Sequence, residues 1–254
     1  MSPDEVRWRD YQAVLFDLDG VITPTAIVHM RAWAEMFADF LGAHAPQAAP
    51  YTDADYYAHV DGKPRYDGVR DFLASRGITL PEGSPADPPE AETVCGLGNR
   101  KNDAFNAVLA RDGVSAYPGS VLLLDHLATL GLPLAVVSSS VNAPAVLDSA
   151  GLLDRFGCVV SGAVAAEQHL PGKPAPDTFE YAARQLGAVP ATSVVLEDAT
   201  SGVRAGAAGD FALVVGVDRG VGRDALADAG ADVVVDDLAE LAPTAPATPV
   251  GGAA

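Results

Sequence analysis

The fold is decided by the stretch Ala13-Val14-Leu15-Phe16-Asp17-Leu18-Asp19-Gly20-Val21-Ile22, which places two carboxylates directly after a short apolar run. A continuous apolar run of this length is typical of a strand buried on both faces of a parallel sheet. With a side-chain period of two, Asp17 and Asp19 share one side of the chain, and Gly20 lets the backbone turn away after them. Both acids are therefore predicted at the carboxyl end of a strand, where open α/β sheets bind their ligands.

The composition of the chain bounds its partners and its environment. Its 254 residues are 49% hydrophobic and 20% charged, which allows one large domain or a domain carrying an insertion. The formal net charge of -18 argues against nucleic acid and anionic membranes as partners, because their phosphates need Lys and Arg. No run reaches the roughly 18 apolar residues of a membrane span, and residues 1–11 lack the apolar segment of a signal peptide. We expect a cytoplasmic protein in which Cys95 and Cys158 are reduced structural thiols.

The pattern along the chain separates a helical region from a region of alternating strands and helices. Apolar residues recur at helical spacing from Thr25 to Leu41, and Gly42 is expected to end this helix. Residues 51–111 continue as short helical segments, broken by a Pro- and Gly-rich loop at residues 80–89. Apolar strands are then expected, with helical patterns between most of them, at residues 133–137, 158–160, 193–196, 211–215 and 232–235.

This alternation predicts an α/β core with a doubly wound, Rossmann-like parallel sheet and an inserted α-helical cap domain. We assign residues 1–24 and 113–242 to the core and residues 25–112 to the cap. Residues 243–254 are rich in Pro, Ala, Gly and Thr, and we expect them to form a disordered tail.

Three further polar sites follow predicted strands of the core. They are Ser138-Ser139-Ser140, Lys173 and the pair Glu197-Asp198. Each site alone has a plain explanation as a helix cap or a solvated loop. Because the sites follow strands in the same way as the Asp17 and Asp19 pair, they indicate one shared site at the edge of the sheet.

In this order, Asp-x-Asp, Ser, Lys and Glu-Asp resemble the four motifs of the haloacid dehalogenase superfamily of phosphotransferases. The resemblance implies that Asp17 is the nucleophile and that Asp19 is the general acid and base. It also implies that Ser138 and Lys173 hold the phosphoryl group during transfer. The residue types suit this chemistry, because a carboxylate can form an acyl phosphate that splits one hard transfer into two easier ones.

The resemblance further implies one magnesium ion per site, held by Asp17, Asp19, Glu197 and Asp198. Mg²⁺ prefers oxygen ligands and usually binds one or two carboxylates together with substrate phosphate and water. Asp17 and Asp198 would each supply a carboxylate, and Asp19 would supply its backbone carbonyl. Glu197 would contribute directly or through water. Lys173 and the metal would together give the positive field that the acidic chain lacks.

The predicted cap narrows the resemblance to the β-phosphoglucomutase branch of this superfamily. Residues 22–33 look like the beginning of that cap, with His29 and Trp33 one helical turn apart on one face. Gly62-Lys63-Pro64-Arg65 resembles the segment whose Arg binds the phosphate that is not being transferred. Arg100-Lys101-Asn102-Asp103 is similar to the second basic segment of the cap.

The core loop 138–142 is similar to the loop whose later Ser and Asn bind the same distal phosphate. Plainer readings stay open for His29 as a satisfied helical histidine, Trp33 as a core residue and Lys101 as a surface charge. Arg65 has the strongest support, because a planar guanidinium can bind phosphate bidentately. The implied substrate-binding residues are His29, Trp33, Arg65, Lys101, Ser139, Ser140 and Asn142.

Two departures from the family pattern bear on the activity. The family usually has Asp where this chain has Pro24, and Pro fixes one φ angle and removes a backbone donor at the cap hinge. The best-known mutases have Lys where this chain has Val141, so one cation is missing from the distal phosphate site. Arg65 together with Arg100 or Lys101 is the candidate compensation.

The implied reaction interconverts β-D-glucose 1-phosphate and glucose 6-phosphate through an aspartyl-phosphate enzyme, with β-glucose 1,6-bisphosphate as intermediate and activator. We expect a monomer whose partner is a small-molecule sugar phosphate. Two alternatives stay open: a sugar-phosphate phosphatase, which shares every core motif, and an inactive phosphosugar-binding protein. A dehalogenase is disfavoured, because that chemistry needs neither Asp19 nor a magnesium site.

Overall fold

A six-stranded parallel sheet forms the centre of the protein, whose computed structural model describes residues 2–242. The strand order is β3-β2-β1-β4-β5-β6, so β1 lies between β2 and β4 and the winding of the chain reverses there. The predicted doubly wound α/β fold is confirmed, and such a reversal marks the place where these sheets bind ligands. The strands are β1 (Ala13–Phe16), β2 (Leu134–Val137), β3 (Cys158–Val160), β4 (Ser193–Glu197), β5 (Leu213–Val217) and β6 (Val233–Val235).

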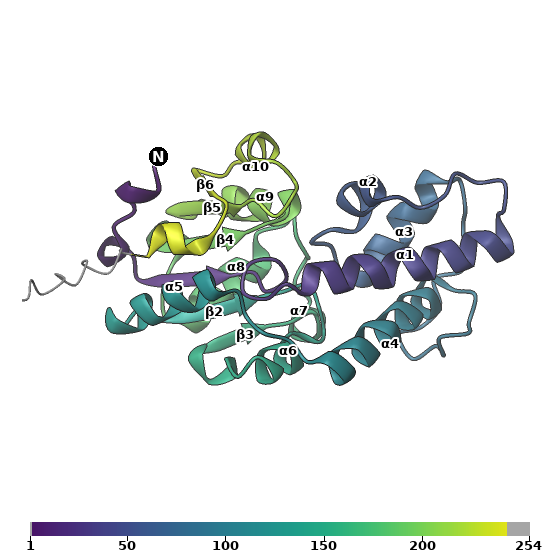
Figure 1. Cartoon of the computed structure of the whole chain (residues 1–254), viewed down its shortest axis with the longest axis horizontal. Helices are drawn as coiled ribbons and strands as arrows, with labels where there is room; N and C mark the ends of the chain where they lie inside the picture. The colour runs from purple at the N-terminus through teal and green to yellow at the C-terminus, as the bar shows by residue number, and fades with distance from the viewer. Residues whose placement is uncertain (1, 243–254) are drawn as a thin grey trace, which may run out of the picture.

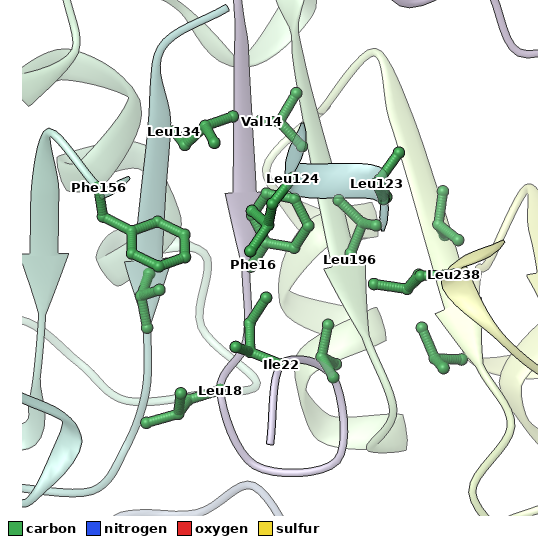
Figure 2. Packing of buried hydrophobic residues seen from close by; sticks show 14 of the residues in the cluster. Val14, Phe16, Leu18, Ile22, Leu123, Leu124, Leu134, Phe156, Leu196 and Leu238 are labelled. Carbon is green, nitrogen blue, oxygen red and sulfur yellow. The ribbon is translucent and has the colours of Figure 1, made fainter. Parts of the chain in front are cut away.

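Helices cover both faces of the sheet, because the buried strands present apolar side chains on both sides (Figure 1). On one face, Phe16 of β1 packs with Leu124 and with Phe156, whose ring centroid lies 6.2 Å away (Figure 2). On the other face, Leu15 belongs to a second apolar cluster. The helices are α5 (Pro118–Thr129), α6 (Ala143–Ser149), α7 (Gly162–Glu167), α8 (Asp177–Gln185), α9 (Thr200–Ala208) and α10 (Arg223–Ala229), with short 3-10 turns η1 (Pro3–Glu5), η2 (Trp8–Asp10), η4 (Leu153–Arg155), η5 (Pro190–Thr192) and η6 (Leu238–Leu241).

The remaining helices form a separate helical layer beyond the carboxyl edge of the sheet, which we call the cap (Figure 1). It has an apolar core of its own, in which the Phe37 ring lies 5.3 Å from Trp33 and 4.0 Å from Phe72 between centroids. This separate core supports the proposed division of the chain into core and cap. The cap elements are α1 (Thr25–His44), α2 (Asp53–Asp55), the π-helical turn η3 (Tyr56–Val60), α3 (Arg65–Ser75) and α4 (Val94–Asp112).

Several predicted boundaries were wrong, and two of the differences occur at glycines. Helix α1 continues through Gly42 to His44. A glycine inside a helix costs only about 1 kcal/mol, and burial of the preceding Phe40 and Leu41 against the cap core offsets that cost. Strand β5 also continues through Gly216, where a Cβ would lie 3.1 Å from the Cβ of Leu226, so this glycine lets α10 approach the sheet closely.

The cysteines, the hydropathy of the helices and the C-terminal residues were also subjects of prediction. Cys95 and Cys158 are both free. Among the helices that residues 2–242 form, none is both long and apolar enough to cross a membrane. The expected tail at residues 243–254 lies outside the described residues.

Candidate active site

A cavity of about 660 Å³ lies between the carboxyl edge of the sheet and the cap. Residues that directly follow β1 and β2, and the last residue of β4, meet residues from α1, α3 and α4 around it. The predicted site residues that line it are Asp17, Asp19, His29, Trp33, Arg65, Lys101, Ser138, Ser139, Ser140, Lys173, Glu197 and Asp198.

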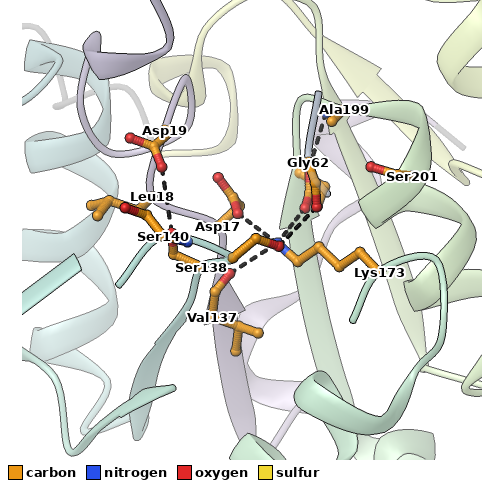
Figure 3. A network of polar contacts seen from close by, with 12 residues as sticks. Asp17, Leu18, Asp19, Gly62, Val137, Ser138, Ser140, Lys173, Ala199 and Ser201 are labelled. Atoms are coloured by element: carbon orange, nitrogen blue, oxygen red, sulfur yellow. Dashed lines mark hydrogen bonds and ion pairs between the residues drawn. The ribbon is translucent and has the colours of Figure 1, made fainter. Parts of the chain in front are cut away.

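Lys173 lies at the centre of the core side of this cavity, where it is 3% exposed (Figure 3). Its Nζ donates to Asp17 Oδ1 at 2.5 Å, to Glu197 Oε1 at 2.6 Å and to the Val137 carbonyl at 2.9 Å. Burial opposes the charge, but the two carboxylates raise the pKa of Lys173 above its usual value. Lys173 is therefore an ammonium ion that neutralises part of an acidic cluster.

That cluster consists of Asp17, Glu197 and Asp198, whose side-chain oxygens lie within 4.8 Å of one another. Burial, together with the charge of Glu197, raises the pKa values of Asp17 and Asp198 well above the usual range, against the opposing effect of Lys173 on Asp17. The raised pKa values mean that one ammonium ion does not fully stabilise the ionised forms of these acids, so a further cation would do so. The donor set fits Mg²⁺, which prefers such oxygens.

The neighbouring backbone is shaped around these carboxylates. Gly20 has a φ of 91°, and a Cβ there would lie 1.8 Å from Asp198 Oδ2, so a side chain has no room. Glu197 uses its second oxygen, Oε2, to accept a hydrogen bond from the Ala199 amide at 2.9 Å. Because both oxygens of Glu197 already have protein donors, Asp17 and Asp198 are better placed to bind a metal directly.

Asp19 lies at the boundary between core and cap and is held by groups from both. Its Oδ1 accepts a short hydrogen bond from Thr25 Oγ1 and lies 3.3 Å from His29 Nε2. Its Oδ2 accepts from Ser138 Oγ at 3.4 Å. Burial raises the pKa of Asp19, but the opposing effect of His29 and Thr25 is larger. The pKa of Asp19 therefore falls to about 2. Asp19 is thus an ionised carboxylate, with its charge stabilised by donors from the core and the cap.

Lys101 and His29 form the cap side of the same network. Lys101 Nζ contacts His29 Nδ1 and lies 5.1 Å from the centroid of the Trp33 ring. Burial, helped by the charge of Arg65, lowers the pKa of Lys101 to about 7. Lys101 is 4% exposed, so the alternative reading of it as a surface charge was wrong.

Trp33 and His29 each agree with both readings left open by the sequence. Trp33 is buried in the apolar core of the cap and also lines the cavity. The His29 ring stacks on Phe105, with centroids 4.0 Å apart, and lines the cavity as well. A residue at the edge of a small apolar core can thus serve packing and contact the cavity at once.

Arg65 begins α3 and lines the cavity. Its guanidinium lies over the Tyr66 ring, 5.0 Å from the centroid, and Tyr66 is in turn fixed by a 2.9 Å hydrogen bond to Asn99. Arg100 instead donates to the Pro89 carbonyl at 2.9 Å and is not among the described residues that line the cavity. Of the two candidates to compensate for Val141, Lys101 is the one that faces the cavity.

Hydrogen bonds from Ser139, Ser201 and Asn142 hold the cap against the core. Ser139 Oγ donates to the Gly62 carbonyl at 2.8 Å, and Ser201 Oγ donates to the Asp61 carbonyl at 3.1 Å. The Asn142 side chain donates to Asn102 at 2.8 Å, and Asn142 is not among the described residues lining the cavity. Ser139 and Asn142, predicted to bind substrate, thus contact the cap.

Sequence reasoning missed two polar residues of the site. Thr25 was read as part of a helix start, yet it lies one helical turn before His29 and contacts the same carboxylate. Asp61 lines the cavity directly before the segment that contains Arg65, and burial together with Glu197 raises its pKa to about 7. The four-residue spacing to His29 and the adjacency to Gly62 were the available signals.

Comparisons with known proteins agree with this fold and site. Residues 11–210 match the family model of haloacid dehalogenase-like hydrolases. The chain is 51% identical to β-phosphoglucomutase of Mycobacterium bovis, over 94% of this chain and 92% of that one. It is 33% identical to β-phosphoglucomutase of Bacillus subtilis, over 91% of each chain.

A solved structure of β-phosphoglucomutase from Clostridium difficile has a TM-score of 0.73, covering 91% of this chain and 93% of that one. At 24% identity that likeness concerns the fold alone. The chain belongs to the haloacid dehalogenase-like hydrolase family, in its β-phosphoglucomutase branch.

Proposed function

We propose that this chain is a phosphosugar mutase that interconverts β-D-glucose 1-phosphate and glucose 6-phosphate. The 51% identity to a β-phosphoglucomutase supports the reaction class. The observation that carries the proposal is that Asp17 of the core and Arg65 of the cap line one cavity. A bisphosphate needs two phosphate sites, because one phosphate reacts while the other must be held.

In the first half of the proposed cycle, Asp17 carries a phosphoryl group. The C6 hydroxyl of glucose 1-phosphate attacks its phosphorus, and Asp19 takes the hydroxyl proton. The bond between phosphorus and the Asp17 oxygen breaks, which releases the Asp17 carboxylate and β-glucose 1,6-bisphosphate. Because its pKa is about 2, Asp19 is ionised at neutral pH, and its oxygens can take the proton as the hydroxyl oxygen bonds to phosphorus and becomes acidic.

In the second half, the bisphosphate presents its C1 phosphate to Asp17. The Asp17 carboxylate attacks that phosphorus, and the bond to the C1 oxygen breaks. Asp19 returns its proton to the C1 oxygen, so glucose 6-phosphate leaves and the phosphoaspartate is restored. Each half uses the same two residues in opposite directions, which is why two acids on one strand end are sufficient.

Charge neutralisation supports both halves. Lys173 is paired with the Asp17 carboxylate, and Ser138 is a further donor, which contacts Asp19. A magnesium ion bound by Asp17, Asp198 and the backbone carbonyl of Asp19, with Glu197 acting through water, would offset the charge on the transferring phosphoryl group. Arg65 and Ser140 would hold the other phosphate, and Lys101 would take the place of the cation missing at Val141.

The test is to incubate the protein with Mg²⁺ and β-glucose 1-phosphate, with and without β-glucose 1,6-bisphosphate, and to follow glucose 6-phosphate and free phosphate by ³¹P NMR. We expect glucose 6-phosphate as the main product, with a rate that rises when the bisphosphate is added. Free phosphate as the main product would identify a phosphatase. Neither product would identify an inactive phosphosugar-binding protein.

A further inference from the structure

Core and cap are joined by two linkers, residues 20–24 and residues 113–117. The linkers touch, because the Tyr117 amide donates to the Ile22 carbonyl at 2.9 Å. The first linker follows Asp19 directly and leads into α1. Any movement of the cap must therefore change the backbone next to the proposed general acid and base.

Arg219 lies in the loop after β5 and contacts both linkers. Its Nε donates to the Gly20 carbonyl of the first linker at 2.8 Å. Its guanidinium lies 4.0 Å from the centroid of the Tyr117 ring of the second linker. A third contact, from Nη1 to the Asp236 carbonyl at 2.9 Å, anchors the same side chain to the end of β6.

The loop that carries Arg219 is itself fixed. Asp218 Oδ1 accepts hydrogen bonds from the Gly220 amide at 2.9 Å and the Gly222 amide at 3.0 Å. A Cβ on Gly220 would lie 3.3 Å from the hydroxyl of Tyr57 in the cap. The loop thus lies close to Tyr57 of the cap and positions Arg219 against both linkers.

The first linker has three successive carbonyls, and each is bound by a different segment. Arg219 binds the Gly20 carbonyl, Ser120 Oγ donates to the Val21 carbonyl at 2.6 Å, and Tyr117 binds the Ile22 carbonyl. Arg219 supplies the charged donor of the three, and charged hydrogen bonds are the stronger kind.

We propose that Arg219 is a positioning residue that clamps both linkers and so fixes Asp19 and the closed position of the cap. The clamp itself does not depend on the reaction. Its expected effect on product partition rests on the proposed function, because a loosened hinge would admit water to the phosphoaspartate and favour hydrolysis over mutase turnover.

Arg223 provides a matched control. It makes a 2.6 Å ion pair with the Asp236 side chain and contacts the Val234 carbonyl, so it also anchors to the end of β6. Within residues 2–242 it makes no hydrogen bond to either linker. Arg223→Gln therefore removes a comparable surface brace and leaves the clamp intact.

The experiment measures amide hydrogen exchange in residues 20–24 and 113–117 for the wild type, Arg219→Gln, Arg219→Lys and Arg223→Gln. We expect exchange in both linkers to accelerate about tenfold or more in Arg219→Gln, less in Arg219→Lys, and not in Arg223→Gln. The ratio of free phosphate to glucose 6-phosphate should rise several-fold in Arg219→Gln alone. Tyr117→Leu, which removes the stacked ring and keeps Arg219, serves if Arg219→Gln fails to fold.

Equal linker exchange in Arg219→Gln and Arg223→Gln would overturn the clamp, as would unchanged exchange in the substitute variant Tyr117→Leu. Faster linker exchange with an unchanged product ratio would overturn the effect on Asp19 and leave Arg219 as a brace. Faster exchange in a protein that forms neither product would support the clamp and refute the proposed function, so the two failures are distinguishable.

Discussion

Two buried lysines line one cavity, and their pKa values shift in opposite directions: that of Lys173 rises and that of Lys101 falls. They are 3% and 4% exposed, so burial disfavours the charge of both. Lys173 lies between two carboxylates, which raise its pKa. Lys101 instead faces an imidazole and the Trp33 ring, and its pKa falls to about 7. The partners of a buried amine, more than its burial, decide whether it stays charged.

This difference extends to the two sides of the cavity. On the core side, Lys173 stays charged because it pairs directly with Asp17 and Glu197. On the cap side, Lys101 and Asp61 both have pKa values of about 7, so their charges respond to conditions near neutrality. We infer that Lys173 provides a constant positive charge for phosphoryl transfer, while the charges of Lys101 and Asp61 on the cap side adapt to what is bound.

The largest expected effect comes from breaking the core side at Asp17. Asp17→Asn should abolish turnover and any covalent phosphoenzyme, because an amide is a poor nucleophile and a poor magnesium ligand. Intact-mass spectrometry after incubation with the bisphosphate measures the phosphoenzyme directly. Phosphorylated protein in this variant would remove Asp17 from the nucleophile position.

Asp19 joins the two sides, and its substitution should cost less than that of Asp17. Asp19→Ala should lower turnover by about 10² to 10⁴, the usual contribution of a general acid and base. Magnesium affinity should stay near that of the wild type, because the metal ligand proposed there is the backbone carbonyl. Turnover within a few-fold of the wild type would show that the proton goes elsewhere.

Replacing each lysine by Met compares the two sides directly. Lys173→Met leaves Asp17 and Glu197 buried without their cation, so we expect a loss of about 3 to 5 kcal/mol in the free energy of unfolding. Lys101→Met should stabilise the fold at pH 7 or destabilise it by less than about 1 kcal/mol, since within residues 2–242 Lys101 forms no ion pair with a carboxylate and only the charge of Asp19 favours its ammonium form. Urea unfolding of both variants measures this difference, and equal losses would contradict the comparison.

The strand ends could be predicted from sequence because a buried parallel strand has a simple pattern and places the following polar residues at one edge. Strand β3 has the predicted bounds, and Asp17, Lys173, Glu197 and Asp198 do meet. The resemblance to the family implied the metal site, and the structure brings its three acidic side chains together.

The sequence could not predict contacts between segments that lie far apart along the chain and meet only in the folded protein. The sequences of α1 and α4 have a helical pattern whether or not the two helices touch. The pattern therefore does not reveal that Lys101 is buried beside His29. Nor does it show that Ser139 and Asn142 would bond to the cap. Such partners depend on how two separately folded layers close on each other.

Arg65 tests whether the cap side binds a second phosphate. Arg65→Ala should lower mutase turnover by well over tenfold, because a charged hydrogen bond is worth about 1.5 to 3 kcal/mol. Hydrolysis of the phosphoenzyme should fall less, since water needs no distal site. Lys63→Met is the control, because Lys63 lines the same cavity but is paired with Asp71. Equal losses of both activities, or no loss, would place the distal phosphate elsewhere.

The smallest expected effect is a change in how stability depends on pH. The pKa of Lys101 is about 7 in the folded protein and near its ordinary value of 10.5 in the unfolded chain. Between these values the unfolded chain binds up to one more proton, so this group makes stability rise with pH by up to about 1.4 kcal/mol per unit. Its unfavourable contribution is fully present below pH 7 and disappears above about pH 10.5. Lys101→Met should therefore flatten the stability profile between pH 7 and 10, measured by urea unfolding at each pH against wild type. Parallel profiles would show that Lys101 keeps its proton in the fold, and the contrast with Lys173 would then fail.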